Sequence, residues 1–191
     1  MAPTFTPISL DDYIVKSSIS LQILPTIALI NDLGSPDWPT RTAARHHLES
    51  LGDSAIPAIL NGCRHQSPQV RADSVSLLDH LADERCLDAL RTALGDPSAR
   101  VRRHAIHSLG CQMCKRQPLQ LDIVGLIIPL ALRDPSIRVR RVAVHQLGLQ
   151  APDPRISAAL DTILNSESDP GLVSRARHAC SRHHPAAGSA C

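Results

Sequence analysis

Two fifteen-residue stretches of this chain are nearly the same. "DPSARVRRHAIHSLG" covers residues 96–110, "DPSIRVRRVAVHQLG" covers residues 134–148, and the two differ at only four positions. In both, apolar residues recur with the three- and four-residue spacing of a helix. Asp-Pro before the run and Leu-Gly after it are typical of a helix start and a helix end. We therefore expect one helix in each stretch, with the aspartate as its N-cap and the proline at its first position.

Weaker copies of the same pattern extend through most of the chain. Ser-Pro or Asp-Pro pairs begin at residues 35, 67, 96, 134 and 169. A second apolar helical stretch, such as "ERCLDALRTAL" or "LDIVGLIIPLAL", lies between successive pairs. Aromatic residues make up only 2% of the chain, and an aliphatic core suits packed helices better than strands. A period of roughly thirty to forty residues with two helices per unit predicts an all-α fold, an α-α superhelix of about five helix-pair repeats.

The two strong copies resemble the second helix of HEAT repeats. They are similar to the HEAT-like repeats of the phycobilisome-lyase type, whose signature is D-P-x-x-x-V-R-x-x-A-x-x-x-L-G. The resemblance covers roughly residues 32–182 and implies a short α-solenoid. Members of this group include assembly scaffolds, chromophore lyases with their chaperones, and DNA glycosylases, so the resemblance leaves the function open. We expect N-terminal capping helices at residues 1–33, HEAT-like repeats at 34–182 and a disordered tail at 183–191.

The arginines of the doubled stretch divide by helical face. At about 100° per residue, Arg102 falls within the apolar stripe of its own helix. A buried guanidinium must be paired, because removing the partner of a buried charge costs about 3–5 kcal/mol. We expect the partner to be an aspartate of the same or the neighbouring unit, Asp96 or Asp134. The resemblance to HEAT repeats implies a structural Asp–Arg ladder between units, and Arg140 occupies the matching position in the next unit.

The other basic residues of the two copies fall on the opposite helical face. They are Arg100, Arg103 and His107 in the first copy and Arg138, Arg141 and His145 in the second. Residues 95–145 contain 9 Lys or Arg against 3 Asp or Glu, whereas residues 1–94 contain 7 against 11. This local charge favours a partner-binding surface. The alternative interpretation is a solvated face that two similar repeats share without any binding role.

The expected function is a non-enzymatic scaffold or adaptor that binds an acidic protein surface. Nucleic acid is an alternative partner, because a basic patch also contacts phosphates. Against it, the patch has no aromatic residue on which bases could stack, and the net charge is only +2. A phycobilin lyase or lyase chaperone is a further alternative, implied by the resemblance alone. The glycosylase activity of some HEAT-like proteins is not expected, because Trp38 is the one tryptophan of the chain.

Cys111 and Cys114 form a CxxC that follows His107. Two thiolates at this spacing can bind one metal ion, with His107 or His145 as a third ligand. The sequence contains no second CxxC. We therefore interpret both cysteines as small apolar residues in the turn between two helices, with a metal site as the alternative. No Ser–His–Asp order, phosphate-binding glycine loop or paired carboxylates are evident, so we expect neither an enzyme nor a bound cofactor.

The ends of the chain carry no recognisable targeting signal. The start, "MAPTFTPISLDDYIVK", lacks a basic stretch followed by an apolar run, and no segment is long and apolar enough to span a membrane. The six cysteines are scattered through predicted helices and do not frame a small loop-rich domain. We expect a cytoplasmic protein that does not contact membranes. The sequence does not indicate its oligomeric state.

Overall fold

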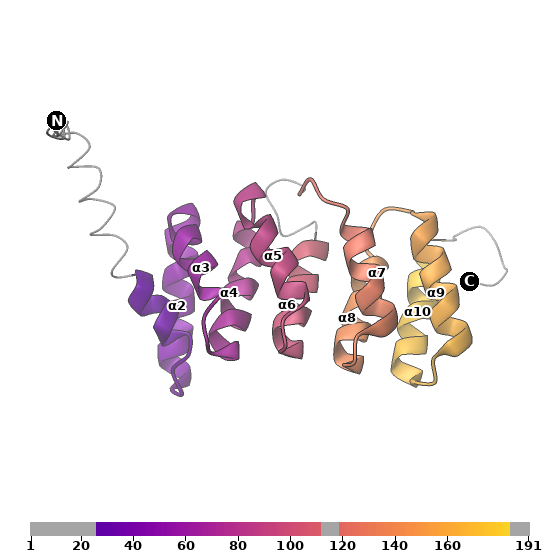
Figure 1. The fold of residues 1–191 in the computed structure, drawn as a ribbon, viewed down its shortest axis with the longest axis horizontal. Coiled ribbons are helices and arrows are strands. Elements are labelled where there is room, and N and C mark those ends of the chain that lie inside the picture. Colours follow the sequence, from indigo (N-terminus) through magenta and orange to yellow (C-terminus); the bar gives the residue numbers. More distant parts are fainter. Residues whose placement is uncertain (1–25, 112–118, 184–191) are drawn as a thin grey trace, which may run out of the picture.

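The computed structural model describes residues 26–111 and 119–183, which form a row of helix pairs (Figure 1). Residues 26–32 are helical, and two short 3-10 helices, Gly52–Ala55 and Glu84–Cys86, lead into α3 and α5. The labelled helices are α2 (Trp38–Leu51), α3 (Ile56–Gly62), α4 (Pro68–Leu81), α5 (Leu87–Leu94), α6 (Ala99–Gly110), α7 (Ile123–Arg133), α8 (Ile137–Leu147), α9 (Pro154–Ser166) and α10 (Pro170–His183). Among the described helices, none is long and apolar enough to cross a membrane.

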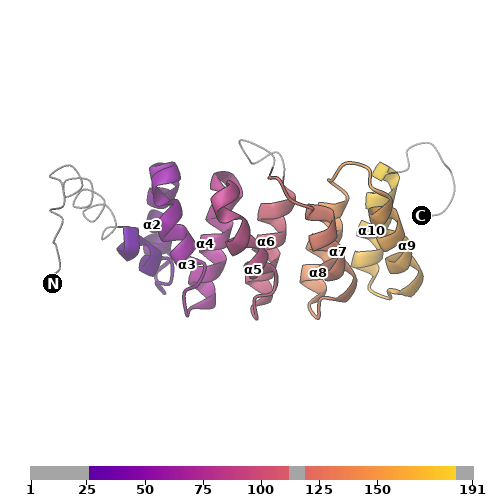
Figure 2. The same ribbon diagram turned by 45° about the horizontal axis from the view of Figure 1, so that its top comes forward.

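The helices lie in two layers (Figures 1 and 2). Helices α3, α5, α7 and α9 form one layer, and each packs against the helix that follows it in the chain. The second layer contains α4, α6, α8 and α10, where each helix packs against the next in the row. Each unit therefore contacts mainly its neighbours, as in other helical repeat proteins. This arrangement confirms the predicted all-α superhelix.

The core is a continuous aliphatic stripe between the layers. In each of the doubled stretches, four apolar side chains at matching positions are fully buried: Val101, Ala105, Ile106 and Leu109 in α6, and Val139, Ala143, Val144 and Leu147 in α8. Burying one such large aliphatic side chain contributes roughly 1.5–3 kcal/mol. The shared residues of the two stretches are thus largely those that pack one unit against the next.

The expected boundaries at residues 33 and 182 remain predictions. Ile30 and Leu33 are buried in the common core, so the helical residues 26–32 pack with the first repeat. Helix α10 extends to His183, the first residue of the segment expected as a tail. Residues 1–25 and 184–191 lie outside the described part of the chain.

The repeated helices begin two residues later than the sequence pattern suggests. Helix α6 begins at Ala99 with Ser98 as its N-cap, and the expected cap, Asp96, lies two residues earlier. The Asp96 carboxylate accepts a 2.8 Å hydrogen bond from the Ser98 N–H, and Asp134 makes the same contact before α8. An aspartate that bonds the N–H two residues on forms an Asx turn, which keeps its own backbone out of the helix. Pro97 therefore precedes the helix instead of starting it.

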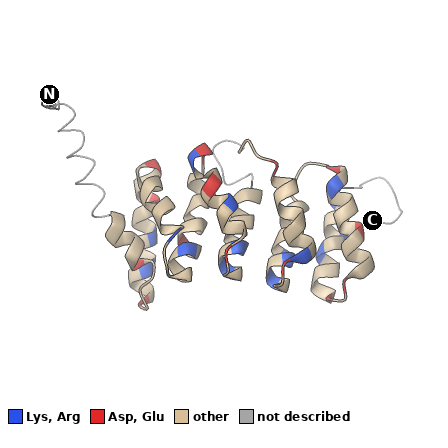
Figure 3. Cartoon of the chain, in the orientation of Figure 1, with Lys and Arg blue, Asp and Glu red and all other residues tan. Residues whose placement is uncertain are grey.

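Arginine–aspartate pairs join successive units of the second layer. Arg71 of α4 bonds both carboxylate oxygens of Asp96, at 2.7 and 3.0 Å, and Arg102 of α6 bonds both oxygens of Asp134, at 2.7 and 2.8 Å. The Arg102 and Asp134 side chains are only 11% and 3% exposed. Basic and acidic segments accordingly lie together at the starts of α6 and α8, along the lower edge of the array in Figure 3.

The same arginines also close the loop of their own unit. Arg102 donates from Nη1 to the carbonyl oxygens of Asp96 and Pro97, at 2.7 and 3.1 Å. Arg71 makes the equivalent bonds to His65 and Gln66, and Arg41 makes them to Ser35 and Pro36. The side chain therefore fixes its own loop through backbone carbonyls and the next unit through a carboxylate. The acid position facing Arg41 holds His65.

The last joint uses a glutamate and a different register. Arg140 bonds Glu167 through one nitrogen at 3.0 Å, and Glu167 in turn accepts the N–H groups of Ser168 and Asp169. Glu167 thus occupies the position that Asp96 and Asp134 have in their units. Asp169, the residue of the final Asp-Pro pair, accepts the N–H of Leu172 at 2.7 Å and caps α10. The final Asp-Pro pair is therefore two residues out of register with those at 96 and 134.

Replacing Arg102 by alanine should clearly destabilise the array. The change leaves the carboxylate of Asp134 buried without its bidentate partner, so we expect a loss of about 3–5 kcal/mol in the free energy of unfolding. Chemical denaturation followed by circular dichroism measures this loss. Arg103→Ala, one residue along the same helix but outside the ladder, is the matched control and should change stability by less than about 0.5 kcal/mol. Equal losses in the two variants would contradict the structural role of Arg102.

Candidate partner-binding face

Basic side chains line two adjoining grooves over α6, α8 and α10. The first groove has a volume of about 380 Å³ and is lined by Arg103, Arg138, Arg141, His145 and Arg175, with Val142. The second has a volume of about 500 Å³, shares Arg141, His145 and Arg175 with the first, and adds His178 and Arg182. No aspartate or glutamate of the described residues lines either groove. We call the seven basic residues of the two grooves the basic face.

The structure brings four of the six sequence-predicted residues together in this face: Arg103, Arg138, Arg141 and His145. Arg138 and His145 are exposed and Arg103 is half-buried. These side chains come from successive helices of the second layer, because the repeat places matching positions side by side. The other two predicted residues, Arg100 and His107, turn toward the preceding unit.

Arg100 is held against α4. Its guanidinium bonds Asp73 at 3.0 Å and also contacts the side-chain oxygen of Gln69. The Arg100 side chain is 48% exposed, so this ion pair is solvated. A surface pair of this kind contributes little to stability, but it neutralises much of the arginine's charge. Arg100 therefore adds little to the basic face.

His107 faces an acid of the preceding unit. Its Nε2 atom lies 3.2 Å from Oδ2 of Asp79, a residue of α4 whose side chain is 9% exposed. Its Nδ1 atom lies 3.2 Å from Nε2 of Gln146 in α8. His107 is thus held between two neighbouring helices and lines neither groove. Helical angle alone does not separate His107 from His145, since the difference lies in the neighbouring units.

Arg141 belongs to the basic face but is paired. Its guanidinium bonds the carboxylate of Asp169 through two nitrogens, with contacts of 3.1, 2.9 and 2.8 Å. Gly171 makes room for this contact, because a Cβ atom there would lie 2.8 Å from Nη2 of Arg141. Arg141, which the sequence analysis places on the face opposite the apolar stripe, therefore also contacts the following unit. The cause is the shifted register of the last unit, which places Asp169 within its reach.

Three residues of the basic face escape the sequence analysis: Arg175, His178 and Arg182. An alignment of the last unit on its Asp-Pro pair assigns these three residues to the wrong helical positions, because that pair is two residues out of register with the stronger copies. Aligning the buried Leu172 and Ala176 with Val139 and Ala143 of α8 restores the register. In that alignment His178 matches His145, which is the signal that could have identified it.

Two histidines of this region, His104 and His145, are protonated less readily than an ordinary histidine. His145 is exposed but partly desolvated by its neighbours, which lowers its pKa, and the nearby positive groups Arg175, His107 and Arg182 lower it further. Burial, followed by the charges of Arg100 and Arg103, lowers the pKa of His104 to about 4. Positive neighbours disfavour a further positive charge. The fixed charge of the basic face therefore comes from its arginines.

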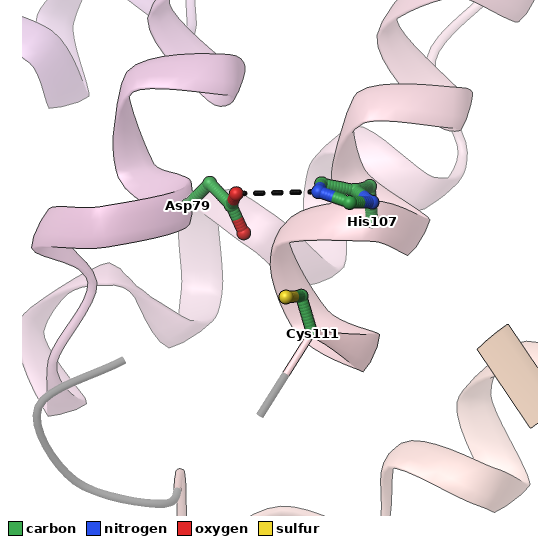
Figure 4. A group of neighbouring side chains, drawn as sticks. All are labelled: Asp79, His107 and Cys111. Carbon is green, nitrogen blue, oxygen red and sulfur yellow. Dashed lines mark ion pairs between the residues drawn. The ribbon is translucent and has the colours of Figure 1, made fainter. Parts of the chain in front are cut away.

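A second group of functional side chains lies between α4 and α6. The ligating atoms of Asp79, His107 and Cys111 all lie within 4.8 Å of one another (Figure 4). Cys114, the other cysteine of the CxxC, lies outside the described residues. His145, the alternative third ligand, is not part of this group. The structure therefore brings His107 and Cys111 together with an aspartate that sequence reasoning did not include.

Comparison with known proteins supports the repeat assignment. The family model for HEAT repeats matches residues 56–124. No curated protein sequence matches the chain. This match indicates HEAT repeats over residues 56–124, in agreement with the two-layered array and with the resemblance of the doubled stretch.

Among solved structures, the chain is similar to a lyase component. The structure of the complex of CpcE and CpcF of phycocyanin lyase from Nostoc sp. PCC7120 aligns with a TM-score of 0.66 at 25% identity, over 83% of this chain and 99% of the other. A designed armadillo repeat protein in complex with the peptide (KR)4 aligns with a TM-score of 0.50 at 17% identity, over 82% and 81% of the two chains. The second likeness concerns the fold alone. The chain thus has a HEAT-repeat fold that is similar to the phycocyanin lyase structure.

We expect His104 to stay neutral until the pH falls to about 4. An unfolded histidine has a pKa of about 6.5, so the unfolded chain binds more protons than the folded one between these values. Stability should therefore fall by about 1–3 kcal/mol as the pH decreases through this window, and His104→Gln should remove that part of the decrease. NMR titration of the His104 ring and denaturation at several pH values measure both effects. A titration midpoint near 6.5 in the folded protein would contradict the proposed burial effect.

Proposed function

We propose that this protein is a non-enzymatic HEAT-repeat scaffold that binds an acidic surface of a partner protein through the basic face. The observation that carries the proposal is the clustering of Arg103, Arg138 and Arg175 around two grooves that no described carboxylate lines. A groove lined by charges of one sign attracts ligands of the opposite sign and raises their association rate. Cytoplasmic localisation remains our expectation for such a scaffold.

The composition of the grooves supports a protein partner over nucleic acid. Apolar and small residues, Val142, Leu149 and Ala179, lie between the basic side chains, and Leu149 is 40% exposed. Protein interfaces combine apolar contact with arginine, which is enriched among the residues that dominate binding energy. Binding of single-stranded nucleic acid typically requires aromatic side chains for base stacking, and neither groove contains one.

A second candidate function is a role like that of a phycocyanin lyase component. The likeness to the CpcE and CpcF structure favours it, because that alignment spans 99% of the other chain. By this analogy the chain would form a complex with a second component of a lyase. Mixing the purified protein with a bilin and recording its absorption spectrum tests this role directly. If the spectrum of the mixture equals the sum of the separate spectra of the protein and the bilin, this would count against a role in bilin binding.

Reversing the charge of the basic face should abolish partner binding. The test compares affinity purification from the source organism with three baits: the natural protein, the triple variant Arg103→Glu/Arg138→Glu/Arg175→Glu, and Arg91→Glu. Arg91 is an exposed arginine of α5, in the other layer, and serves as the matched control. We expect a protein with an acidic surface to co-purify with the natural chain and the control, and its recovery to fall at least about tenfold with the triple variant.

The same experiment separates the alternatives. A partner that is released by nuclease treatment would favour the nucleic-acid interpretation, because phosphates rather than a protein surface would then contact the arginines. Undiminished recovery with the folded triple variant would show that the basic face is not the interface. Thermal denaturation of each bait verifies that the reversed charges leave the array folded.

A further inference from the structure

We propose that Asp79, His107 and Cys111 form a binding site for a divalent transition metal ion of the zinc type at the contact between α4 and α6. One carboxylate oxygen, one imidazole nitrogen and the thiol sulfur lie within 4.8 Å of one another. In Figure 4, Asp79 and His107 point toward each other across the gap between the two helices, and Cys111 lies below them at the end of α6. The site therefore joins two successive units of the array.

The backbone places these donors without special strain. His107 and Cys111 are four residues apart at the end of α6, so both face the same side of the helix. Nε2 of His107 lies 3.2 Å from Oδ2 of Asp79. With metal–ligand bonds of about 2.0–2.1 Å to nitrogen and oxygen and about 2.3 Å to sulfur, a tetrahedral site places neighbouring ligand atoms about 3.3–3.6 Å apart. The carboxylate and the imidazole thus already have nearly the required spacing, and the thiol sulfur lies within 4.8 Å of both.

The donor set selects the class of metal. A thiolate and an imidazole are ligands that zinc and its chemical relatives prefer, whereas magnesium and calcium favour sites made of oxygen atoms. Three protein ligands leave a fourth tetrahedral position for water. The expected occupant is therefore Zn²⁺, and Co²⁺ is a suitable spectroscopic probe because it accepts the same ligands.

Asp79, one of the three proposed ligands, stands at a position where the repeat pattern has a glycine. The doubled stretches end in Leu-Gly, and Asp79 occupies the position of Gly110 and Gly148. A Cβ atom on Gly110 would lie 2.8 Å from Cβ of Gln146 in the next unit, so a side chain there would clash. By the same register, the residue opposite Asp79 is Ser108, whose small side chain leaves room for a carboxylate. Asp79 is 7% exposed, and a buried carboxylate is stabilised by nearby positive charge, which a metal ion supplies.

Gln146 contacts His107 at Nδ1, the ring nitrogen that does not face Asp79. It is 2% exposed, its Nε2 lies 3.2 Å from Nδ1 of His107, and its buried Oε1 has no hydrogen-bond partner within the described residues. Rotating the amide by half a turn brings Oε1 to Nδ1, where it would accept the ring N–H. That bond leaves the lone pair on Nε2, which faces Asp79. Metal-bound histidines are commonly oriented by such a partner on the other ring nitrogen.

Other thiols and histidines of the chain provide controls. Burial, followed by the neighbouring Cys86, raises the pKa of the Cys63 thiol to about 12, and burial also raises the pKa of Cys86. Both thiols therefore stay protonated near neutral pH and compete poorly for a metal. His178 occupies the register position of His107 in the last unit, and within the described residues it belongs to no group of three metal-ligating side chains.

The test is titration of the full chain, purified without a histidine tag, with Co²⁺ and then with Zn²⁺. We expect one Co²⁺ per chain, with a thiolate-to-cobalt charge-transfer band and the visible bands of a tetrahedral ion, both lost when Zn²⁺ displaces it. His107→Ala and Asp79→Asn should each weaken binding by at least about tenfold. Cys111→Ser should remove the charge-transfer band, and His178→Ala should leave the titration unchanged.

Three results would overturn the site. They are the lack of one-to-one Co²⁺ binding by the folded natural protein, equal affinity in the His107→Ala variant, and a charge-transfer band that survives in Cys111→Ser. Circular dichroism of each variant checks its fold. Since Asp79, His107 and Cys111 lie outside the basic face, this outcome is independent of the affinity purification that tests the proposed function.

Discussion

The contact between an arginine of one unit and an acid of the next is the interaction on which the array depends. Arg102 bonds the carbonyls of its own loop and both carboxylate oxygens of Asp134, so one side chain sets the shape of a loop and its distance from the following unit. In a repeat protein each unit is positioned by its neighbours alone. The spacing of the second-layer helices, and with it the alignment of everything they carry, therefore follows from this contact and the aliphatic stripe beside it.

Core packing and the ladder together leave part of each second-layer helix free to vary. The functional features lie where a unit departs from the shared pattern. Asp79 replaces a glycine of the pattern and faces His107, and Asp169 stands two residues out of register and pairs with Arg141. The basic face depends on the same freedom, because Arg103 and Arg138 occupy positions where the units of α2 and α4 carry uncharged residues. The residues that all units share thus build the array, and the binding chemistry lies at positions that differ among the units.

Much of this organisation could be predicted from sequence, because helical periodicity is a local property. The two strong copies indicate the superhelix, and the angle of Arg102 predicts its burial. Contacts between units are harder to predict from sequence, since they depend on the register of two segments some thirty residues apart. The pairing of Arg141 with Asp169, the pairing of His107 with Asp79 and the place of Arg175 were missed for this reason. The helix starts were misjudged because the aspartates that resemble N-caps form Asx turns and serve the ladder.

The arginine–acid contacts of the ladder also differ from one joint, that is, one contact between neighbouring units, to the next. The two central joints each have a bidentate arginine–aspartate pair, and the last joint combines one bond from Arg140 with the pair of Arg141 and Asp169. At the first joint, His65 occupies the position that an acid has in the others. When the contacts between successive units are stressed together, the weakest contact breaks first. A load or a thermal fluctuation that bends the protein is thus absorbed first at the N-terminal joint, while the middle, where α4, α6 and α8 meet, keeps its form. Both the metal-binding cluster and the inner half of the basic face lie on that stiff segment.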